Sequence, residues 1–77
     1  MKRPLALTQP EIGKLVRSLR LETGLTQEKF ASELGVTFPT VNRWENNRAT
    51  PSPLAVEKIE KMLRRLGSRG QKLLAKY

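Results

Sequence analysis

Cysteine, histidine and aspartate are all absent from this sequence of 77 residues, so its seven acidic residues are all glutamate. Without cysteine the chain has neither a disulfide framework nor a thiolate metal site. Most other metal sites and most general acid–base arrangements draw on His, Cys or Asp. We therefore expect a protein that is not an enzyme and that uses no metal or cofactor.

Long hydrophobic runs are also missing. The apolar run Leu5-Ala6-Leu7 is much shorter than the roughly 7–15 residues of a signal-peptide core. No stretch approaches the ~18 apolar residues that a membrane span needs. The expectation is a cytoplasmic protein without membrane contact, built as one small domain because domains typically hold about 50–200 residues.

Positive charge is the abundant feature, with 15 Lys and Arg against seven Glu and a net charge of +8. Such a balance suits a polyanionic partner such as nucleic acid. Residues 61–77 contain six of the basic residues and no acid, whereas residues 1–60 hold the other nine and every glutamate. A solvated basic tail would give the same pattern, so charge alone assigns no function.

Helical signals divide the chain after an N-terminal arm at residues 1–8. Thr8 and Glu11 stand at capping-box spacing, with Thr8 as the expected N-cap, and Gly24 supplies a stop. Between them, apolar residues recur at i, i+3, i+4 and i+7, which predicts a first helix over about residues 9–23. These apolar residues are Ile12, Leu15, Val16 and Leu19.

Three more helices follow by the same reasoning. Thr26 and Gly35 bracket a second helix over about 27–34, and Ser52-Pro53 opens a fourth over about 53–66. Residues 67–77 are expected to be a basic C-terminal tail or a short helix. Strand signals are lacking, because no sustained alternation of apolar and polar residues occurs.

The third helix, over about 38–46, contains Pro39, which would cost about 3 kcal/mol in a helix interior. With Thr37 as the N-cap, however, Pro39 falls in the first turn, where backbone N–H groups have no intrahelical partner. Val36 and Val41 then stand at hydrophobic-staple spacing. Val41 and Trp44 are expected to face the core.

The second and third helices, joined through Gly35, form a predicted helix-turn-helix. In such motifs the second helix can lie in the DNA major groove. An ordinary pair of antiparallel helices in a small bundle would have similar lengths, so spacing alone does not decide between the two.

Particular residues favour the DNA-binding alternative. Residues 25–53 read LTQEKFASELGVTFPTVNRWENNRATPSP, and this stretch resembles the helix-turn-helix core of the phage-repressor/Cro (Xre) family. With the flanking helices the resemblance covers residues 9–66. The matching residues are Leu25-Thr26-Gln27-Glu28, Phe30-Ala31, Leu34-Gly35-Val36-Thr37, Val41, Trp44-Glu45 and Pro51-Ser52-Pro53.

The resemblance implies a compact all-α, lambda-repressor-like bundle of four to five helices. It also implies sequence-specific binding of double-stranded DNA by a transcriptional regulator, which acts as a homodimer on its operator. Base readout would involve Phe38, Pro39, Asn42 and Arg43. Phosphate contacts would involve Gln27, Thr37, Asn46, Asn47 and Arg48, and Arg20 and Glu45 would form a structural salt bridge.

This chain departs from the family at positions 38 and 39, which often carry polar side chains. Phe38 and Pro39 cannot hydrogen-bond to bases, but Phe38 could pack on a thymine methyl. A partly exposed helix-capping hydrophobe is the alternative for Phe38. Arg43 is then the best candidate for a bidentate contact to guanine, and Asn42 could reach a base or a phosphate.

A second class of function is an antitoxin-type interaction module. Such a module binds a partner protein, a toxin or another acidic protein, together with its own promoter. The basic segment 61–77 would then contact that partner rather than phosphates. Four apolar residues are candidates for a dimer contact, with local packing as the alternative: Leu66, Leu73, Leu74 and Tyr77.

Overall fold

The computed structural model describes residues 9–77, which form five helices and contain no strand. These elements confirm the predicted all-α fold class. The helices are α1 (Glu11–Thr23), α2 (Gln27–Leu34), α3 (Phe38–Glu45), α4 (Pro53–Arg65) and α5 (Ser68–Ala75).

The start of α1 differs from the prediction. The helix begins at Glu11 rather than near residue 9, and Pro10 occupies the N-cap position without a side-chain cap. The predicted cap, Thr8, lies outside the described residues, as does the whole arm 1–8. The side chain of Gln9 contributes to the cap of α1, because its Oε1 accepts a hydrogen bond from the Gly13 N–H at 3.0 Å.

Gln9 also joins α1 to the end of α3. Its Nε2 donates to the carbonyl oxygens of Trp44 at 3.1 Å and Ala49 at 2.6 Å. These partners lie 35 and 40 residues further along the chain. A local capping pattern contains no information about such distant partners.

The helix ends show how local sequence sets the other boundaries. Thr26 Oγ1 accepts from the Lys29 N–H at the start of α2, and Ser52 Oγ accepts from the Ala55 N–H at the start of α4. The glycine that follows α2, Gly35, adopts φ +72°, a left-handed conformation that costs glycine little.

The first turn of α3 contains Pro39, as the sequence suggested. Thr37 is the N-cap residue, and its carbonyl oxygen accepts from the N–H groups of Thr40 and Val41 at 3.1 and 3.3 Å. The Thr37 hydroxyl bonds to the Thr40 hydroxyl at 2.9 Å instead of to a backbone N–H. Because the missing N–H of Pro39 has no role at this position, the proline lies in the first turn of α3 without interrupting the helix.

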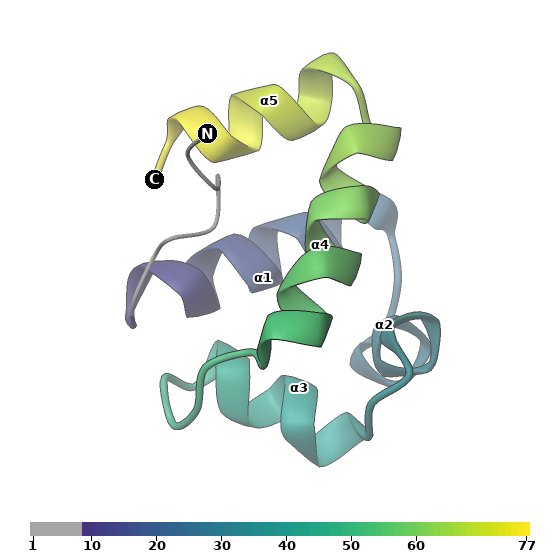
Figure 1. Cartoon of the computed structure of the whole chain (residues 1–77), viewed down its shortest axis with the longest axis vertical. Coiled ribbons are helices and arrows are strands. Elements are labelled where there is room, and N and C mark those ends of the chain that lie inside the picture. The colour runs from purple at the N-terminus through teal and green to yellow at the C-terminus, as the bar shows by residue number, and fades with distance from the viewer. Residues whose placement is uncertain (1–8) are drawn as a thin grey trace.

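Helix α1 lies in the middle of the bundle and packs against α3 on one side and α5 on the other (Figure 1). Helix α2 packs against α3 and α4, and α4 also contacts α5. All five helices contribute to one core, in which Trp44 is 2% exposed, as predicted. The buried core residues are Ile12, Leu15, Val16, Leu19, Phe30, Ala31, Leu34, Val41, Trp44, Ala55, Ile59, Leu63 and Leu73.

The C-terminal segment is the short helix α5 rather than a frayed tail. Leu73 is buried, while Leu66, Leu74 and Tyr77 are half-buried against the core. The Tyr77 hydroxyl bonds to Ser18 Oγ of α1 at 3.1 Å. Local packing therefore uses most of the surface of these four residues. None of the described helices has both the length and the apolar character needed to cross a membrane.

Candidate nucleic-acid interface

The turn between α2 and α3 is held from both sides. The Val36 N–H donates to the Ala31 carbonyl at 2.9 Å, which closes the Schellman-type end of α2. From α4, Lys58 Nζ donates to the Leu34 carbonyl at 3.1 Å. A cation at a helix C-terminus also complements the helix dipole. The relative positions of α2 and α3 are thus set by backbone geometry and by a side chain from a third helix.

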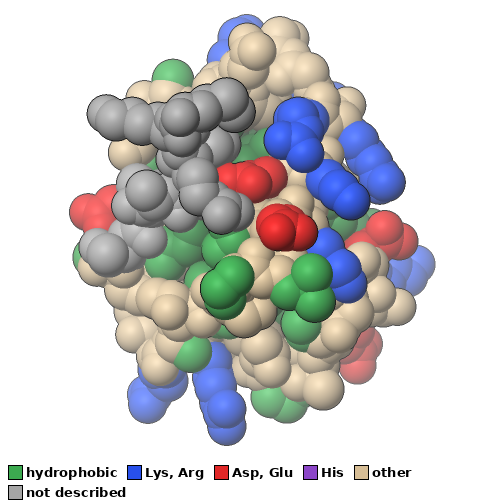
Figure 2. Space-filling view, viewed as in Figure 1, with side chains coloured by type: hydrophobic (Ala, Val, Ile, Leu, Met, Phe, Trp, Pro, Cys, Tyr) green, Lys and Arg blue, Asp and Glu red, His purple; other side chains and the backbone are tan. Residues whose placement is uncertain are grey.

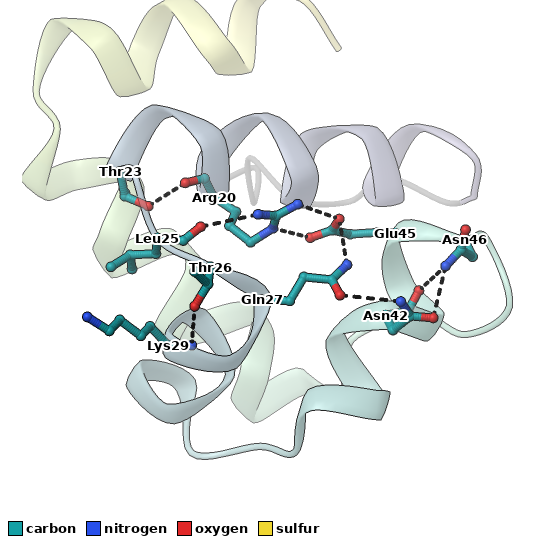
Figure 3. Close-up of polar contacts among 9 residues, drawn as sticks. All are labelled: Arg20, Thr23, Leu25, Thr26, Gln27, Lys29, Asn42, Glu45 and Asn46. Atoms are coloured by element: carbon teal, nitrogen blue, oxygen red, sulfur yellow. Dashed lines mark hydrogen bonds and ion pairs between the residues drawn. The ribbon is translucent and has the colours of Figure 1, made fainter.

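One face of α3 is exposed while the opposite face is buried. Val41 and Trp44 are almost fully buried, whereas Phe38 is 44% exposed and Pro39 and Arg43 are exposed. The structure therefore brings three of the four predicted base-reading residues onto one free surface. Asn42, the fourth, is half-buried, because its side chain turns toward α2 (Figure 3).

The loop after α3 presents three further predicted contacts. Asn46, Asn47 and Arg48 are all exposed, and Asn47 has a positive φ of 62°. The Arg48 N–H donates to the Arg43 carbonyl at 2.8 Å, which folds the loop back onto the end of α3. Thr37, another predicted phosphate contact, is exposed at the opposite end of α3.

Arg20 of α1 and Glu45 of α3 form an ion pair in the interior. Arg20 Nε lies 2.7 Å from Glu45 Oε2, and Arg20 Nη2 lies 3.1 Å from Glu45 Oε1. The side chains are only 14% and 5% exposed. Arg20 Nη1 also donates to the Leu25 carbonyl at 3.2 Å. The hydrogen bond to Glu45 raises the pKa of Arg20 above its ordinary value.

Hydrogen bonds extend from this ion pair to the surface of α3 (Figure 3). Gln27 Nε2 donates to Glu45 Oε1 at 3.1 Å, and Asn42 Nδ2 donates to Gln27 Oε1 at 3.3 Å. Asn46 Nδ2 then donates to Asn42 Oδ1 at 3.0 Å and to the Asn42 carbonyl at 2.8 Å. The structure therefore connects residues to which the sequence assigned three separate roles.

Sequence reasoning missed three residues that position this surface. Gln9 and Lys58 hold the ends of α3 and α2 through contacts that no local pattern signals. Gly13 did leave a signal, since glycine inside a helical pattern often marks close packing. A Cβ at Gly13 would meet the Trp44 carbonyl, so glycine allows α1 to approach the end of α3.

The charge on the surface gathers in more than one place. Figure 2 shows Lys and Arg side chains beside α4 and α5 and again at the end of the molecule that α3 occupies. Arg43 and Arg48 are the exposed cations of α3 and its loop. Within residues 9–77, no three His, Cys, Asp or Glu side chains come together in a way that could hold a metal ion.

A helix-turn-helix with an exposed second helix and cations at its end defines a class of DNA-binding domain. The helix-turn-helix family model matches residues 16–66. The chain belongs to this family, of the Xre or phage-repressor/Cro type, as the sequence had indicated. It is therefore a DNA-binding protein of a family of transcriptional regulators that are typically not enzymes.

Two curated relatives are similar to this chain. An uncharacterized HTH-type transcriptional regulator of Methanothermobacter thermautotrophicus is 41% identical over 51 residues, which cover 66% of this chain and 74% of that protein. A propionyl-CoA carboxylase regulator of Cereibacter sphaeroides is 43% identical over 44 residues, which cover 57% of this chain but only 10% of that protein. No solved structure matches the chain.

Proposed function

We propose that this protein regulates transcription by placing α3 in the major groove of a specific double-stranded DNA sequence. The observation that carries the proposal is the division of α3 into two faces. Val41 and Trp44 anchor the helix in the core, and Phe38 and Arg43 are left exposed. An α-helix fits the major groove, where the four base pairs present distinct patterns of donors, acceptors and methyl groups.

Arg43 is the proposed hydrogen-bonding reader. Its guanidinium can donate two parallel hydrogen bonds to O6 and N7 of guanine, a contact that discriminates by about 1–3 kcal/mol. Phe38 and Pro39 have no side-chain donor or acceptor, so they suit the apolar edge of thymine. We therefore expect an operator in which a guanine lies close to a thymine methyl.

Phosphate contacts are proposed on both sides of α3. Gln27 is the first residue of α2, where free N–H groups and the helix dipole favour an anion. One N–H of its Nε2 is used by Glu45, which leaves the second for a phosphate oxygen. Thr37, Asn47 and Arg48 are exposed at the two ends of α3. Such contacts fix the position of the protein on DNA without reading sequence.

A homodimer on DNA is part of the proposal, since a single small module buries a limited DNA interface. The second candidate function is an antitoxin-type module. It is supported by the exposed cations of α4 and α5, which would suit an acidic partner protein.

The test is a selection from random DNA duplexes, followed by affinity measurements with two arginine variants. We expect Arg43→Ala to relax the preference at one operator position by roughly 5- to 150-fold, the equivalent of about 1–3 kcal/mol. Arg48→Ala should weaken binding to all duplexes alike and reduce the salt dependence.

Palindromic symmetry in the selected sites would support the dimer, because operator symmetry mirrors protein symmetry. The proposal fails if wild-type protein selects no sequence. The role of Arg43 fails if Arg43→Ala loses the same affinity for selected and scrambled duplexes.

A further inference from the structure

Three amide side chains lie in a row between the ion pair and the surface of α3. We call Gln27, Asn42 and Asn46 the amide chain. Every link in it runs in one direction, because each residue donates through its side-chain nitrogen toward the residue nearer Glu45 (Figure 3). The role inferred for the amide chain rests on the proposed DNA-reading function of α3.

The direction of the amide chain has a physical origin. A carboxylate can only accept hydrogen bonds, so Gln27 must turn its nitrogen toward Glu45. Its oxygen then faces Asn42, which must donate in turn. The Asn42 oxygen is left facing Asn46, whose nitrogen donates to it at 3.0 Å. The negative charge of Glu45 therefore determines which way round all three amides lie.

The Asn46 end of the amide chain favours the same amide orientation as the Glu45 end. Asn46 Nδ2 also donates to the backbone carbonyl of Asn42 at 2.8 Å, and a carbonyl can only accept. A flip of the Asn42 amide would place nitrogen against nitrogen on one side and oxygen against oxygen on the other. The Glu45 carboxylate and the Asn42 backbone carbonyl thus favour the same orientation. A reversed Asn42 amide would lose its hydrogen bonds to both Gln27 and Asn46.

Asn42 is poorly suited to reading a base under these conditions. A base-reading amide uses its nitrogen and oxygen together on one base edge. One N–H of Asn42 Nδ2 and one lone pair of its Oδ1 already have protein partners on different residues, which fix the plane of the amide, and the residue is half-buried. Asn46 has likewise committed its nitrogen inward, to two acceptors on Asn42, so its outward atom is an oxygen that cannot donate to phosphate.

We propose that Asn42 is a positioning residue whose amide orientation is set by Glu45 through Gln27. Asn42 holds α3 against the start of α2 and does not read the operator. Among the predicted base-reading residues of α3, Arg43 then remains the one that can make hydrogen bonds to a base. The predicted phosphate contacts of the following loop are then made by Asn47, Arg48 and backbone N–H groups.

The first test measures urea unfolding and needs no DNA. In Asn42→Asp the new carboxylate cannot donate to Gln27 Oε1, so we expect a lower unfolding midpoint. Arg20 donates to both oxygens of Glu45, so the amide of a Glu45→Gln variant is free to turn only when Arg20 is also replaced. In an Arg20→Met, Glu45→Gln double variant the amide at 45 can donate to Gln27 and the direction of the amide chain can reverse. Gln27 would then donate to the new carboxylate at position 42, and the same Asn42→Asp substitution should lower the midpoint by much less.

A second background keeps this test decisive if the Arg20→Met, Glu45→Gln double variant does not fold. Gln27→Met removes the opposing oxygen and leaves the Arg20–Glu45 pair intact, so Asn42→Asp should again shift the midpoint less than in wild-type protein. Equal shifts in the wild-type and Gln27→Met backgrounds would overturn the contact. An equal shift in a folded Arg20→Met, Glu45→Gln background would overturn the control of the amide orientation by Glu45.

The DNA test compares selections from random duplexes by wild-type protein and Asn42→Ala. We expect the same preferred base at every operator position and a lower affinity for all duplexes. A changed preference confined to one position would show that Asn42 reads a base and would overturn the proposal. If wild-type protein selects nothing, the proposed function fails, while the unfolding tests still report on the amide chain.

Discussion

Gly13 faces the end of α3 from the buried side of α1. A Cβ atom at this position would meet the Trp44 carbonyl and would lie 2.8 Å from both Asn47 Oδ1 and Gln9 Oε1. Because one of these contacts is to backbone, a rotamer change cannot relieve it. The missing side chain at position 13 is therefore what lets Gln9 reach both helices.

We expect Gly13→Ala to lower the free energy of unfolding, although alanine normally stabilises a helix by up to about 1 kcal/mol relative to glycine. Overpacking of this kind typically costs about 1–3 kcal/mol. Urea unfolding followed by Trp44 fluorescence would measure the loss.

Gly24→Ala is the matched control for Gly13→Ala. Gly24 has a φ of +73° and open space around the position of a Cβ, so its variant reports backbone strain without a clash. A stability of Gly13→Ala equal to or above that of wild-type protein would contradict the close approach of α1 and α3.

The Arg20–Glu45 and Arg69–Glu22 ion pairs differ in their surroundings. Arg69 and Glu22, 3.1 Å apart, have side chains 57% and 37% exposed, against 14% and 5% for Arg20 and Glu45. Exposed pairs contribute about 0–1 kcal/mol, whereas breaking a buried pair costs about 3–5 kcal/mol because it leaves an unpaired charge. The inner pair therefore matters far more to the arrangement of α1 and α3.

At the scale of whole elements, α3 shows how position decides the effect of a proline. Pro39 lies in the first turn, and its ring constrains φ to a value that suits a helix. At Asn42, three residues later, the backbone N–H donates a hydrogen bond within the helix. A proline at that position would lose this hydrogen bond and would also clash with the preceding turn.

We expect Pro39→Ala to change the free energy of unfolding by less than about 1 kcal/mol, since mainly the entropy of the unfolded chain changes. Asn42→Pro should cost about 3 kcal/mol or more. Asn42→Ala separates the loss of the side chain from the break in the helix. Circular dichroism and urea unfolding would measure both effects, and a large loss in Pro39→Ala would show that the proline does more than begin α3.

Local signals located the helices well where their ends are made locally. Thr26, Gly35 and Ser52 each act within a few residues of their place in the sequence, so α2 and α4 lie where the pattern suggested. The beginning of α1 was located less closely, at Glu11 rather than near residue 9, and the partners of Gln9 beside it lie near residue 45. Residues 67–77 were ambiguous because α5 depends on packing Leu73 against α1 and α4.

The candidate site was predictable residue by residue but not as a set of contacts. Family resemblance pointed to Arg20, Gln27, Asn42 and Glu45 individually. It did not show that Gln27 lies between Glu45 and Asn42, because residues 27 and 42 belong to different helices. Only the Asn42–Asn46 contact, four residues apart on one helix, has a spacing that sequence alone could have suggested.

On the scale of the whole molecule, α3 and α5 lie at opposite ends (Figure 1). The longest dimension is 29 Å, whereas charges at 0.1 M salt are screened beyond about 10 Å. The exposed cations Lys72 of α5 and Lys76, which directly follows α5, are therefore too far from a duplex at α3 to interact strongly with its phosphates.

We expect the combined Lys72→Gln and Lys76→Gln substitutions to leave the operator affinity and its salt dependence nearly unchanged. Arg48→Gln should reduce the slope of log K against log salt by about 0.9, the value for one phosphate contact. Titrations of the same duplex at several salt concentrations would measure both slopes. A reduced slope in the double lysine variant would place α5 on the DNA backbone.

The contacts of Gln9 have a practical consequence for anyone who shortens this protein. The family match begins at residue 16, yet α1 begins five residues earlier and contributes Ile12 and Leu15 to the core. A fragment cut at the family boundary would lose those side chains and the amide that holds the loop at Ala49. The smallest piece that keeps the recognition surface in place must therefore begin no later than residue 9.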